Sequence, residues 1–531
     1  MYVDYNHDGI NNYNDTVMSG VTVTDTTTGK TTTTGASGTY TLAPMGQGSH
    51  TITITVPSGY QIVGSTSRSI TVGPNTTSVN FFITPLYTIS GIVCNDPAID
   101  GSCLQSEDTI LSGTNSLIVG NVTTDGTVVG TISQAAYQAG IKVISGTYTV
   151  AYSTANGYYF TASKVPGKSL PPYTVSVGQS TVPGNQYTCV APAAGTTDAS
   201  CSSNNIVNMN FAVSNLEAWS QGWCTDLRLE APGMDIHVPN TGVCSDSSSG
   251  ISTSNSYAII CLNNNAGAGV YYAGQNSPTF GYNNGQASLP NYLVGGSYPE
   301  NFTPVSGINR ASYTYLIDTV NSSGITPTNL SGIDPVSGNQ YCGTGGTGSC
   351  NFESSLPDGV YTLNGNLTID SGTSGVPVTL PDPGKNKSYV FLVSGTITIN
   401  SDIIVPSDSS VVFASKGDIF VSGNVGQDLA NYASPTPNLE GFYSTEGDFW
   451  ILTNNTTGYP CGAAGTPIDK RLNIVGGVIV GGTVQNQREL CKYDAQCPVT
   501  TYSTGYTYLL NAPAFVKHKA QLWQEKTPSG Q

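Results

Sequence analysis

Alternation of polar and apolar residues with a period of two runs through this chain, interrupted by Gly, Asn and Pro. Residues 48–60, GSHTITITVPSGY, alternate Thr with Ile as a strand with one buried face does. No stretch with a convincing helical period precedes Ala512. The sequence therefore predicts an all-β protein.

The stretch Gly48–Tyr60 has a counterpart in Gly146–Tyr158, and both open with Gly and close with Gly-Tyr. Each is followed by an apolar strand and then by a strand that contains Asn; these strands are residues 69–72 and 79–83 in the first copy, and 173–177 and 207–211 in the second. Two copies of one small sandwich domain explain this repeat.

The rhythm changes from about Leu216 onward. A Gly-x-apolar-x-apolar unit recurs with starts 30, 22, 30 and 30 residues apart, at Gly365, Gly395, Gly417, Gly447 and, in looser form, Gly477. Such spacing is typical of a coiled parallel sheet, and a further sandwich is the alternative. We therefore expect Ig-like or prealbumin-like β-sandwich domains at residues 1–85 and 86–215, followed by a β-solenoid (β-helix-like) domain at 216–531.

Charge excludes two classes of partner. Lys and Arg number 17 against 33 Asp and Glu, the net charge is −16, and no basic stripe occurs. Nucleic acids and anionic membrane surfaces both select such a stripe, so we expect neither as a partner. No apolar run is long enough to span a bilayer, and no signal peptide is recognisable.

The twelve cysteines indicate disulfides. Eight form four close pairs in polar loops: Cys94 and Cys103, Cys189 and Cys201, Cys342 and Cys350, and Cys491 and Cys497. These spacings are wider than those of most zinc sites, and the chain has only four His. Disulfides that close short loops are expected instead, which indicates an extracellular protein. The pairing of the other four stays open: Cys224, Cys244, Cys261 and Cys461.

A short acidic loop near the start is the strongest local motif. Oxygen-bearing residues fall at loop positions 1, 3, 5, 9 and 12, with Gly9 at position 6. Calcium takes about six to eight oxygens around one point, and glycine permits the sharp turn that gathers them. Position 7 contributes a backbone carbonyl. The sequence therefore predicts calcium as the cofactor, held by Asp4, Asn6, Asp8, Ile10, Asn12 and Asp15.

A metal-free turn rich in Asn and Asp is the alternative for this loop. Asp15 is also shorter than the Glu usual at position 12, which predicts weaker binding. The second copy holds Asp96, Asp100, Glu107 and Asp108 at stretched spacing. There an ion site and a plain acidic turn are both open.

Residues 1–85 resemble the repeated B-type domains of Gram-positive surface adhesins, and residues 87–214 resemble a divergent second copy. The acidic loop carries the resemblance together with Ser19–Val23, Gly38–Leu42 and the strand that ends at Tyr60. The resemblance implies a calcium-stiffened stalk that holds a distal domain away from the cell, with Asp4, Asn6, Asp8 and Asp15 as ligands. Some related domains form a Lys–Asn cross-link; Lys30 is the one lysine of the first copy and lies in a turn, so we expect none there.

Residues 216–531 are similar to uncharacterised surface proteins of small-genome, uncultured bacteria. The motifs that carry this patchy resemblance are Ala218–Trp223, Leu439–Tyr443, Leu472–Gly477, Leu510–Phe515 and Trp523–Glu525. It implies a β-helix-like sheet and a surface location, and it implies no chemistry.

Residues that could carry catalysis are sparse. Glycoside hydrolysis needs paired carboxylates, and Asp418 and Asp448 occupy the same place in successive glycine units. A solvent-facing acidic position beside a turn is the simpler interpretation. The four His, which include His7 and His50, belong to no catalytic triad and are expected at the surface. We therefore do not expect an enzyme.

The sequence predicts a secreted cell-surface protein with a structural or adhesive role. Its partners are expected to be cell-surface glycans or proteins, or further copies of itself in a fibre or surface layer. Self-assembly by strand addition is suggested because residues 87–93 open the second copy with a strand that the first copy lacks. An upstream segment that supplies this strand explains the difference equally well. A carbohydrate-active enzyme or a lectin-like module on the solenoid is the alternative function.

Overall fold

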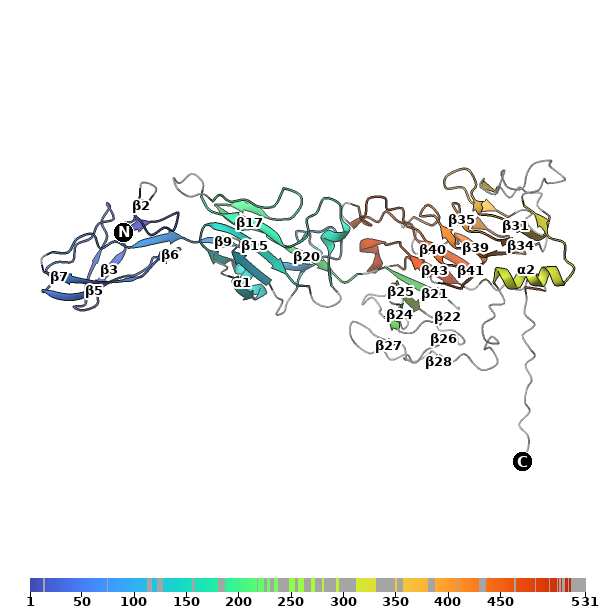
Figure 1. The fold of residues 1–531 in the computed structure, drawn as a ribbon, viewed down its shortest axis with the longest axis horizontal. Coiled ribbons are helices and arrows are strands. Elements are labelled where there is room, and N and C mark those ends of the chain that lie inside the picture. Colours follow the sequence, from blue (N-terminus) through green and yellow to red (C-terminus); the bar gives the residue numbers. More distant parts are fainter. Residues whose placement is uncertain are drawn as a thin grey trace, which may run out of the picture. The chain divides into compact units, whose positions relative to one another are not determined.

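The chain forms two compact units, Met1–Asn215 and Leu216–Gln531. Strands dominate both units and helices are few, so the predicted all-β class is confirmed (Figure 1). The computed structural model describes residues 1–12, 15–73, 75–111, 117–121, 128–154, 158–179, 187–216, 218–223, 227–229, 234–236, 248–253, 256–261, 269–272, 279–280, 293–295, 312–330, 349–350, 357–380, 387–406, 408–428, 436–462, 465–482, 484–495, 497–503, 505, 508, 511–513 and 515–516.

Two sheets make up the first β-region, which we define as residues 1–85. One sheet has the strand order β2-β1-β8-β6 and the other β4-β3-β5-β7. β1 runs parallel to β8, and the other pairs are antiparallel. The strands are β1 (Tyr2–Val3), β2 (Thr16–Val17), β3 (Thr22–Asp25), β4 (Lys30–Thr33), β5 (Gly48–Ile54), β6 (Tyr60–Val63), β7 (Ser67–Val72) and β8 (Phe82–Pro85).

The second β-region, residues 86–215, repeats both strand orders. Its sheets run β11-β10-β20-β16 and β13-β12-β15-β17, and a third sheet, β14-β9-β19-β18, is added. Its elements are β9 (Tyr87–Ile89), β10 (Val93–Asn95), β11 (Thr109–Ile110), β12 (Leu117–Asn121), β13 (Val128–Ile132), α1 (Gln134–Ala139), β14 (Ile141–Val143), β15 (Gly146–Tyr152), β16 (Tyr159–Phe160), η1 (Thr161–Lys164), β17 (Tyr173–Val177), β18 (Ser200–Ser202), β19 (Asn205–Val207) and β20 (Phe211–Ser214).

The repeated stretches found in the sequence occupy the same place in the two regions. β5 lies between β3 and β7, and β15 lies between β12 and β17. Gly48 pairs with Val72 in the first region, and Gly146 pairs with Val177 in the second. The period of two sends alternate β5 side chains inward, where Ile52 joins a core that belongs to the first region.

The C-terminal unit is built mainly on two sheets of parallel strands. The long sheet includes the order β21-β43-β41-β39-β37-β34-β31-β29, and the second has the order β30-β32-β35-β38-β40-β42. Their strands are β21 (Trp219–Trp223), β29 (Thr328–Asn329), β30 (Ser349–Cys350), β31 (Gly359–Leu363), β32 (Leu367–Ile369), β34 (Ser388–Val393), β35 (Ile397–Ile399), β37 (Ser410–Ser415), β38 (Ile419–Val421), β39 (Leu439–Thr445), β40 (Phe449–Ile451), β41 (Leu472–Val480), β42 (Val484–Asn486) and β43 (Thr500–Ser503).

Further strands belong to the same unit. β33 pairs with β36 beside the long sheet, β22, β26 and β28 form a small parallel sheet, and the long sheet continues from β21 through β25, β24, β23 and β27. Their bounds are β22 (Leu227–Leu229), β23 (Met234–Ile236), β24 (Ser248–Thr253), β25 (Ser256–Cys261), β26 (Gly269–Tyr272), β27 (Thr279–Phe280), β28 (Leu293–Gly295), β33 (Val378–Thr379) and β36 (Ile403–Ile404).

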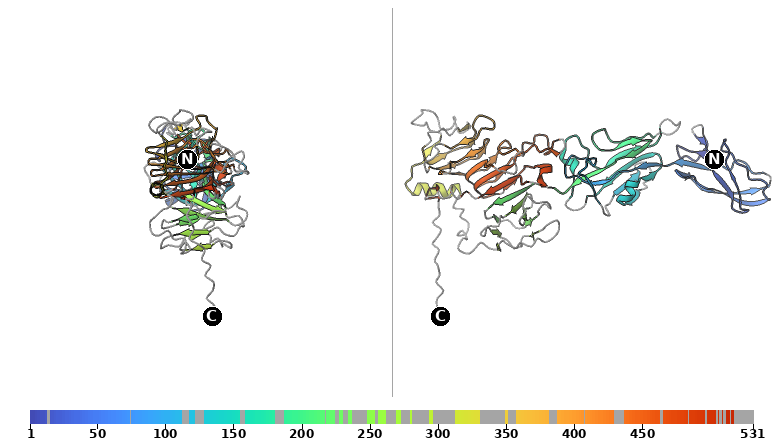
Figure 2. Two further views of the ribbon diagram at one scale, coloured as in Figure 1. Left: turned by 90° about the vertical axis from the view of Figure 1, so that its right-hand side faces the viewer. Right: turned by 180° about the vertical axis from the view of Figure 1, so that it is seen from behind.

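Four of the predicted glycine units precede strands of the second sheet, namely β32, β35, β38 and β40, and these strands pair in register. Figure 2 shows strands of the C-terminal unit, coloured yellow to red, lying side by side. The fifth glycine unit was misplaced, because Gly477 lies inside β41 of the long sheet. The unit that follows β40 begins at Gly482, whose N–H donates to the Gly447 carbonyl and which precedes β42. Glycine suits these corners because a Cβ on Gly395 would lie 2.5 Å from the Gly365 carbonyl oxygen, and a Cβ on Gly447 would clash with the Asp418 carboxylate.

An aromatic ladder fills the interior between the two sheets. Tyr361, Phe391, Phe413 and Tyr443 are in register on neighbouring parallel strands and are buried. Their ring centroids lie 5.3, 5.0 and 5.6 Å apart in that order, with the rings stacked. Each aromatic ring therefore stacks on the ring at the equivalent position of the neighbouring strand.

A helix that the sequence did not predict covers the outer face of the long sheet. α2 (Tyr313–Ser322) starts at Ser312, whose side chain accepts the Tyr315 N–H. Its buried Leu316 and Val320 pack against β31, β34 and β37. Among the helices in the described part of the chain, none is long and apolar enough to cross a membrane.

Candidate metal-binding loops

The predicted calcium loop joins two paired strands. Asp4 directly follows β1 and Asp15 directly precedes β2, and these strands pair antiparallel with Tyr2 opposite Val17. The Asp4 N–H donates to the Ile83 carbonyl of β8 at 2.8 Å and so extends the parallel pairing of β1. Both ends of the loop are therefore fixed by one sheet.

Asp4 organises the first turn of this loop. Its side chain is buried, its Oδ1 accepts the His7 N–H at 2.6 Å, and its Oδ2 accepts the Gly9 N–H at 2.8 Å. Gly9 has a φ of 69°, in the left-handed region that glycine adopts readily. The backbone therefore wraps around this one carboxylate.

Asp8 draws the amide side chains of the loop together. Its Oδ2 accepts hydrogen bonds from Asn6 Nδ2 and Asn12 Nδ2, both at 2.9 Å. Its Oδ1 accepts the Ile10 N–H at 2.8 Å, while the Ile10 side chain is exposed. Ile10 therefore bonds to the loop through its backbone N–H, and the carbonyl ligand predicted for it stays a prediction.

Asp15 has unmet bonding capacity. Both of its carboxylate oxygens are buried, and among the described residues neither has a hydrogen-bond partner. Burial first, and then the charges of Asp4 and Asp8, raise the pKa of Asp15 to about 6, although the nearby Asn12 N–H lowers the pKa in part. Three carboxylates therefore repel one another here, and a bound divalent cation would relieve that repulsion.

The residues present fit a hard divalent cation. The side chains of Asp4, Asp8 and Asp15 supply carboxylate oxygens, and Asn6 and Asn12 supply amide oxygens. Calcium prefers such oxygen ligands and takes about six to eight of them, so the Ile10 carbonyl and water would complete the set. Two residues of this loop, 13 and 14, lie outside the described residues.

A second acidic loop in the second β-region has the same construction. Asp96 directly follows β10 and Asp108 directly precedes β11, and β10 pairs with β11 and runs parallel to β20. Asp96 Oδ2 accepts the Gly101 N–H at 2.9 Å, and Gly101 has a φ of 71°. The buried Asp96 thus stands five residues before a left-handed glycine, as Asp4 does.

Asp108 repeats the chemistry of Asp15. Its Oδ1 is buried and has no hydrogen-bond partner in the part of the chain that the structure describes, while its Oδ2 accepts the Gln105 N–H at 2.8 Å. Burial, with smaller effects from the charges of Asp96, Asp100 and Glu107, raises the pKa of Asp108 to about 6 against the opposing Gln105 bond. The loop of residues 96–108, for which the sequence allowed either an ion site or a plain acidic turn, therefore brings several carboxylates near the Oδ1 of Asp108.

The two loops differ in the ligands that they offer. Counting from Asp96, the places of Asn6 and Asn12 fall on Ala98 and Leu104, so the amide oxygens are lost. The positive charge of Lys168 also acts on Asp100 and lowers its pKa, although burial, the larger effect, raises it. The second loop thus offers fewer oxygen ligands to a cation than the first.

The first acidic loop also contacts the second β-region. Ser145, which directly precedes β15, donates a hydrogen bond from Oγ to the Tyr5 carbonyl at 3.4 Å. The same Oγ lies 3.2 Å from His7 Nε2. Tyr5 and His7 alternate with the expected ligands Asp4, Asn6 and Asp8, so the shape of the loop bears directly on this contact.

Three disulfides are present in the described residues. Two join the predicted pairs, Cys94 with Cys103 and Cys189 with Cys201. The predicted pair Cys342–Cys350 lies outside the residues whose side chains are described. The disulfide between Cys94 and Cys103 joins β10 to the middle of the second acidic loop. The first acidic loop contains no cysteine.

The predicted bond between Cys491 and Cys497 is wrong. Cys491 is bonded to Cys461, 30 residues earlier, and Cys497 has a buried free thiol. The short helix η6 (Cys491–Ala495) directs the Cys497 Sγ to the Tyr493 carbonyl, while Cys461 reaches Cys491 from an earlier part of the chain. Glu489 lies beside the bonded sulfurs, but a disulfide offers no thiolate to a metal.

Asp418, one of the two carboxylates considered for glycoside hydrolysis, accepts a hydrogen bond from the backbone. Asp418 and Asp448 stand one turn apart, and Asp418 Oδ1 accepts the Asp448 N–H at 2.8 Å. Asn366 does the same for the Thr396 N–H at 2.9 Å. These side chains tie successive turns together at the glycine corners.

Comparison with models of known protein families, with curated proteins and with solved structures gives no match to this chain.

Proposed function

We propose that this chain is an extracellular structural or adhesive protein of a cell surface, with an N-terminal stalk stiffened by calcium and disulfides. The buried, unpartnered carboxylate of Asp15 carries the proposal. It stands beside two further carboxylates that raise its pKa, so the place calls for a positive charge. We propose calcium for the first acidic loop and a weaker site for the same ion in the second.

The finer architecture belongs to the same proposal. Each β-region is an Ig-like or prealbumin-like sandwich domain, and the C-terminal unit is a β-solenoid. The shared strand orders of the two β-regions support the first assignment. The in-register parallel strands and the aromatic ladder of the C-terminal unit support the second.

Stiffening follows from what the first loop touches. Its ligands lie beside Tyr5 and His7, which contact Ser145 of the second β-region. An ion that fixes the loop therefore fixes one side of the contact between the two β-regions. Secretion and a surface location are consistent with the disulfides, which persist in oxidising environments.

Titration of the full chain with calcium tests this function. Isothermal titration after EDTA treatment is expected to show binding at the first loop, and the heat is expected to fall in Asp15→Asn. The exposed Asp408→Asn is a charge-matched control that leaves binding unchanged. Small-angle scattering is expected to show a narrower distribution of particle dimensions with calcium. Absence of calcium-dependent heat in the wild-type chain would contradict the proposal.

Self-assembly by strand addition has a defined acceptor in the first β-region. In the second region, β9 pairs with β19, which ends one residue before Asn208 (φ 54°). In the first region the corresponding turn residue is Ser78 (φ 62°), yet residues 75–80 form no strand and residues 75–78 are exposed. We propose that a strand from a second copy pairs with this segment.

Proline placed in this segment tests strand addition, because proline cannot donate to a strand ladder. Thr77→Pro is expected to abolish oligomers seen by light scattering and electron microscopy, and Thr77→Ala is the matched control. If the wild-type chain stays monomeric at all concentrations, strand addition between copies is excluded. No observation in the described residues favours a carbohydrate-active enzyme, and binding on a glycan array would support the lectin alternative.

A further inference from the structure

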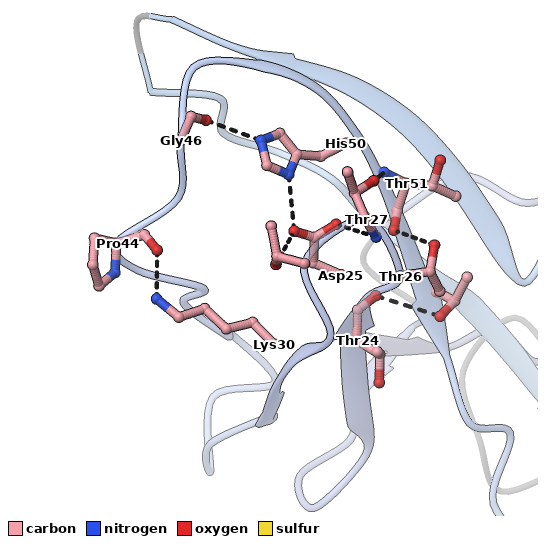
Figure 3. Close-up of polar contacts among 11 residues, drawn as sticks. Thr24, Asp25, Thr26, Thr27, Lys30, Pro44, Gly46, His50 and Thr51 are labelled. Carbon is pink, nitrogen blue, oxygen red and sulfur yellow. Dashed lines mark hydrogen bonds and ion pairs between the residues drawn. The ribbon is translucent and has the colours of Figure 1, made fainter.

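His50 is buried, contrary to the surface position expected for it, and both of its ring nitrogens make hydrogen bonds (Figure 3). Its Nδ1 lies 2.8 Å from Asp25 Oδ2 and its Nε2 lies 2.9 Å from the Gly46 carbonyl. His50 is on β5 and Asp25 is at the end of β3, while Gly46 belongs to the loop of residues 43–47. One imidazole therefore links a strand end to a loop.

The number of protons on His50 follows from its partners. A backbone carbonyl only accepts, and an ionised carboxylate only accepts. A neutral imidazole has one N–H, so it can make one of the two bonds and leaves a lone pair facing an oxygen in the other. Both bonds exist together only when the ring is protonated on both nitrogens.

Asp25 is held in the ionised form that this argument needs. Its Oδ1 accepts the Thr27 N–H at 3.0 Å, and its Oδ2 accepts the Thr28 hydroxyl at 2.5 Å as well as His50. Burial raises the pKa of Asp25, but the hydrogen bonds from Thr28, His50 and Thr27 outweigh it and leave the pKa below its usual value. Thr27, Thr28 and His50 all donate to this carboxylate, and these bonds stabilise its ionised form.

We infer that His50 is a proton-dependent latch that fastens the loop of residues 43–47 to the turn after β3 when it is doubly protonated. Loss of one proton leaves Asp25 to retain the remaining N–H, because a carboxylate is the stronger acceptor. The Gly46 carbonyl then loses its donor. The latch concerns the first β-region alone and does not depend on calcium.

The loop has few other attachments. Lys30 Nζ donates to the Pro44 carbonyl (Figure 3). Met45 packs against the core of the first β-region. The other residues of the loop are exposed. Opening the latch therefore loosens Gly46 and, next to it, the packing of Met45.

Three strands near His50, namely β3, β4 and β7, each carry one charged residue. β3 presents Asp25, β4 presents Lys30, whose ammonium is already bound to Pro44, and β7 carries Arg68 opposite Ile52 rather than opposite His50. The loop of residues 43–47 has no titratable side chain. The hydrogen bond that His50 donates to Asp25, and then the one that it donates to the Gly46 carbonyl, raise the pKa of His50 above its ordinary value although burial lowers it. Because its pKa is raised, protonated His50 stabilises the folded state fully below its unfolded pKa, near 6.5. That stabilisation is lost as the pH rises through the pKa of the folded state.

Two measurements on the full chain test the latch. With only four His in the chain, ¹⁵N-histidine labelling gives few signals, and one imidazole is expected to have both nitrogens protonated at pH 6 and to titrate above 6.5. Hydrogen exchange read by mass spectrometry is expected to show protection of residues 43–49, corrected for intrinsic rates, falling about tenfold as His50 loses its proton, as loss of one charged hydrogen bond predicts.

Variants separate the latch from a merely structural histidine. Asp25→Asn is expected to lower the pH at which protection falls, and His50→Gln is expected to remove the pH dependence. Lys30→Met removes the other attachment and is expected to lower protection equally at every pH. If His50→Gln does not fold, the wild-type titration decides. A neutral His50 at pH 6, or protection of residues 43–49 that is unchanged between pH 5 and 9, would overturn the inference.

Discussion

Asp15→Asn is expected to change stability in opposite directions with and without calcium. The pKa of Asp15 rises from 3.8 to about 6, and a pKa unit corresponds to about 1.4 kcal/mol, so the full shift is equivalent to about 3 kcal/mol. Asp15 is partly exposed as a residue, and solvent screening reduces the figure to roughly 1–2 kcal/mol. In EDTA at pH 7 the substitution removes the cost of burying this charge and its repulsion by Asp4 and Asp8, and it raises the free energy of unfolding by that amount.

Calcium stabilises the wild type more than the variant. At about 100 times the dissociation constant, a bound ligand stabilises the native state by about 2.7 kcal/mol. The wild-type chain gains this stabilisation, while the variant, which lacks one carboxylate ligand, gains less. Wild type is less stable than Asp15→Asn in EDTA, and it becomes the more stable protein once the variant's gain in calcium is smaller than its own by more than roughly 1–2 kcal/mol.

The pH dependence in EDTA has a definite sign. Because the folded pKa of Asp15 lies above the unfolded value, the folded state binds more protons between about pH 4 and 6, and stability falls as the pH rises across that window. The variant lacks this fall. Hydrogen exchange of β1 and β2 reports on the loop locally, since a chain of several units does not unfold in one step. Equal stability of the two proteins in EDTA, or equal gains in calcium, would refute the reasoning.

Four further outcomes are expected. Asp108→Asn repeats the pattern of Asp15→Asn in the exchange of β10 and β11, with a smaller response to calcium, and leaves β1 and β2 unchanged. Cys461→Ser removes a disulfide that closes a 30-residue separation and costs about 3–4 kcal/mol by denaturant unfolding; in the wild type, peptide mapping is expected to find Cys497 unreactive to iodoacetamide at pH 8, because burial raises the pKa of its thiol to about 12. Phe391→Ala breaks the aromatic ladder and destabilises the C-terminal unit by about 3–5 kcal/mol, whereas Thr398→Ala on an outward position changes it by less than about 0.5 kcal/mol.

Strands were predictable where one face is buried and the next turn begins with glycine. The units at Gly365, Gly395, Gly417 and Gly447 each precede a strand of the second sheet. The helix α2 was not predictable in the same way. Its sequence, YTYLIDTVNS, is rich in residues that favour strands, and it is helical because Leu316 and Val320 bury against the long sheet.

The candidate sites show a similar division. Loop spacing alone indicated Asp4 to Asp15, because ligand oxygens and a left-handed glycine follow a fixed order. Asp108 is one residue further from Asp96 than that order allows, and its equivalence to Asp15 rests on the strand that follows each of them. His50 could have been recognised, since it alternates with Ile52 and Ile54 on the inward face of β5. The disulfide partner of Cys491 could not be recognised, because Cys461 lies 30 residues earlier in the chain.

The register of the parallel ladder sets which changes of length the C-terminal unit can absorb. Each of Tyr361, Phe391, Phe413 and Tyr443 packs on the equivalent residue one strand away. Deleting a single residue within a strand would invert which side chains face inward, whereas adding or removing a complete turn would leave every neighbouring pair intact. Homologues of this unit should therefore differ in length by whole strand repeats, and shorter insertions should be confined to the loops between strands.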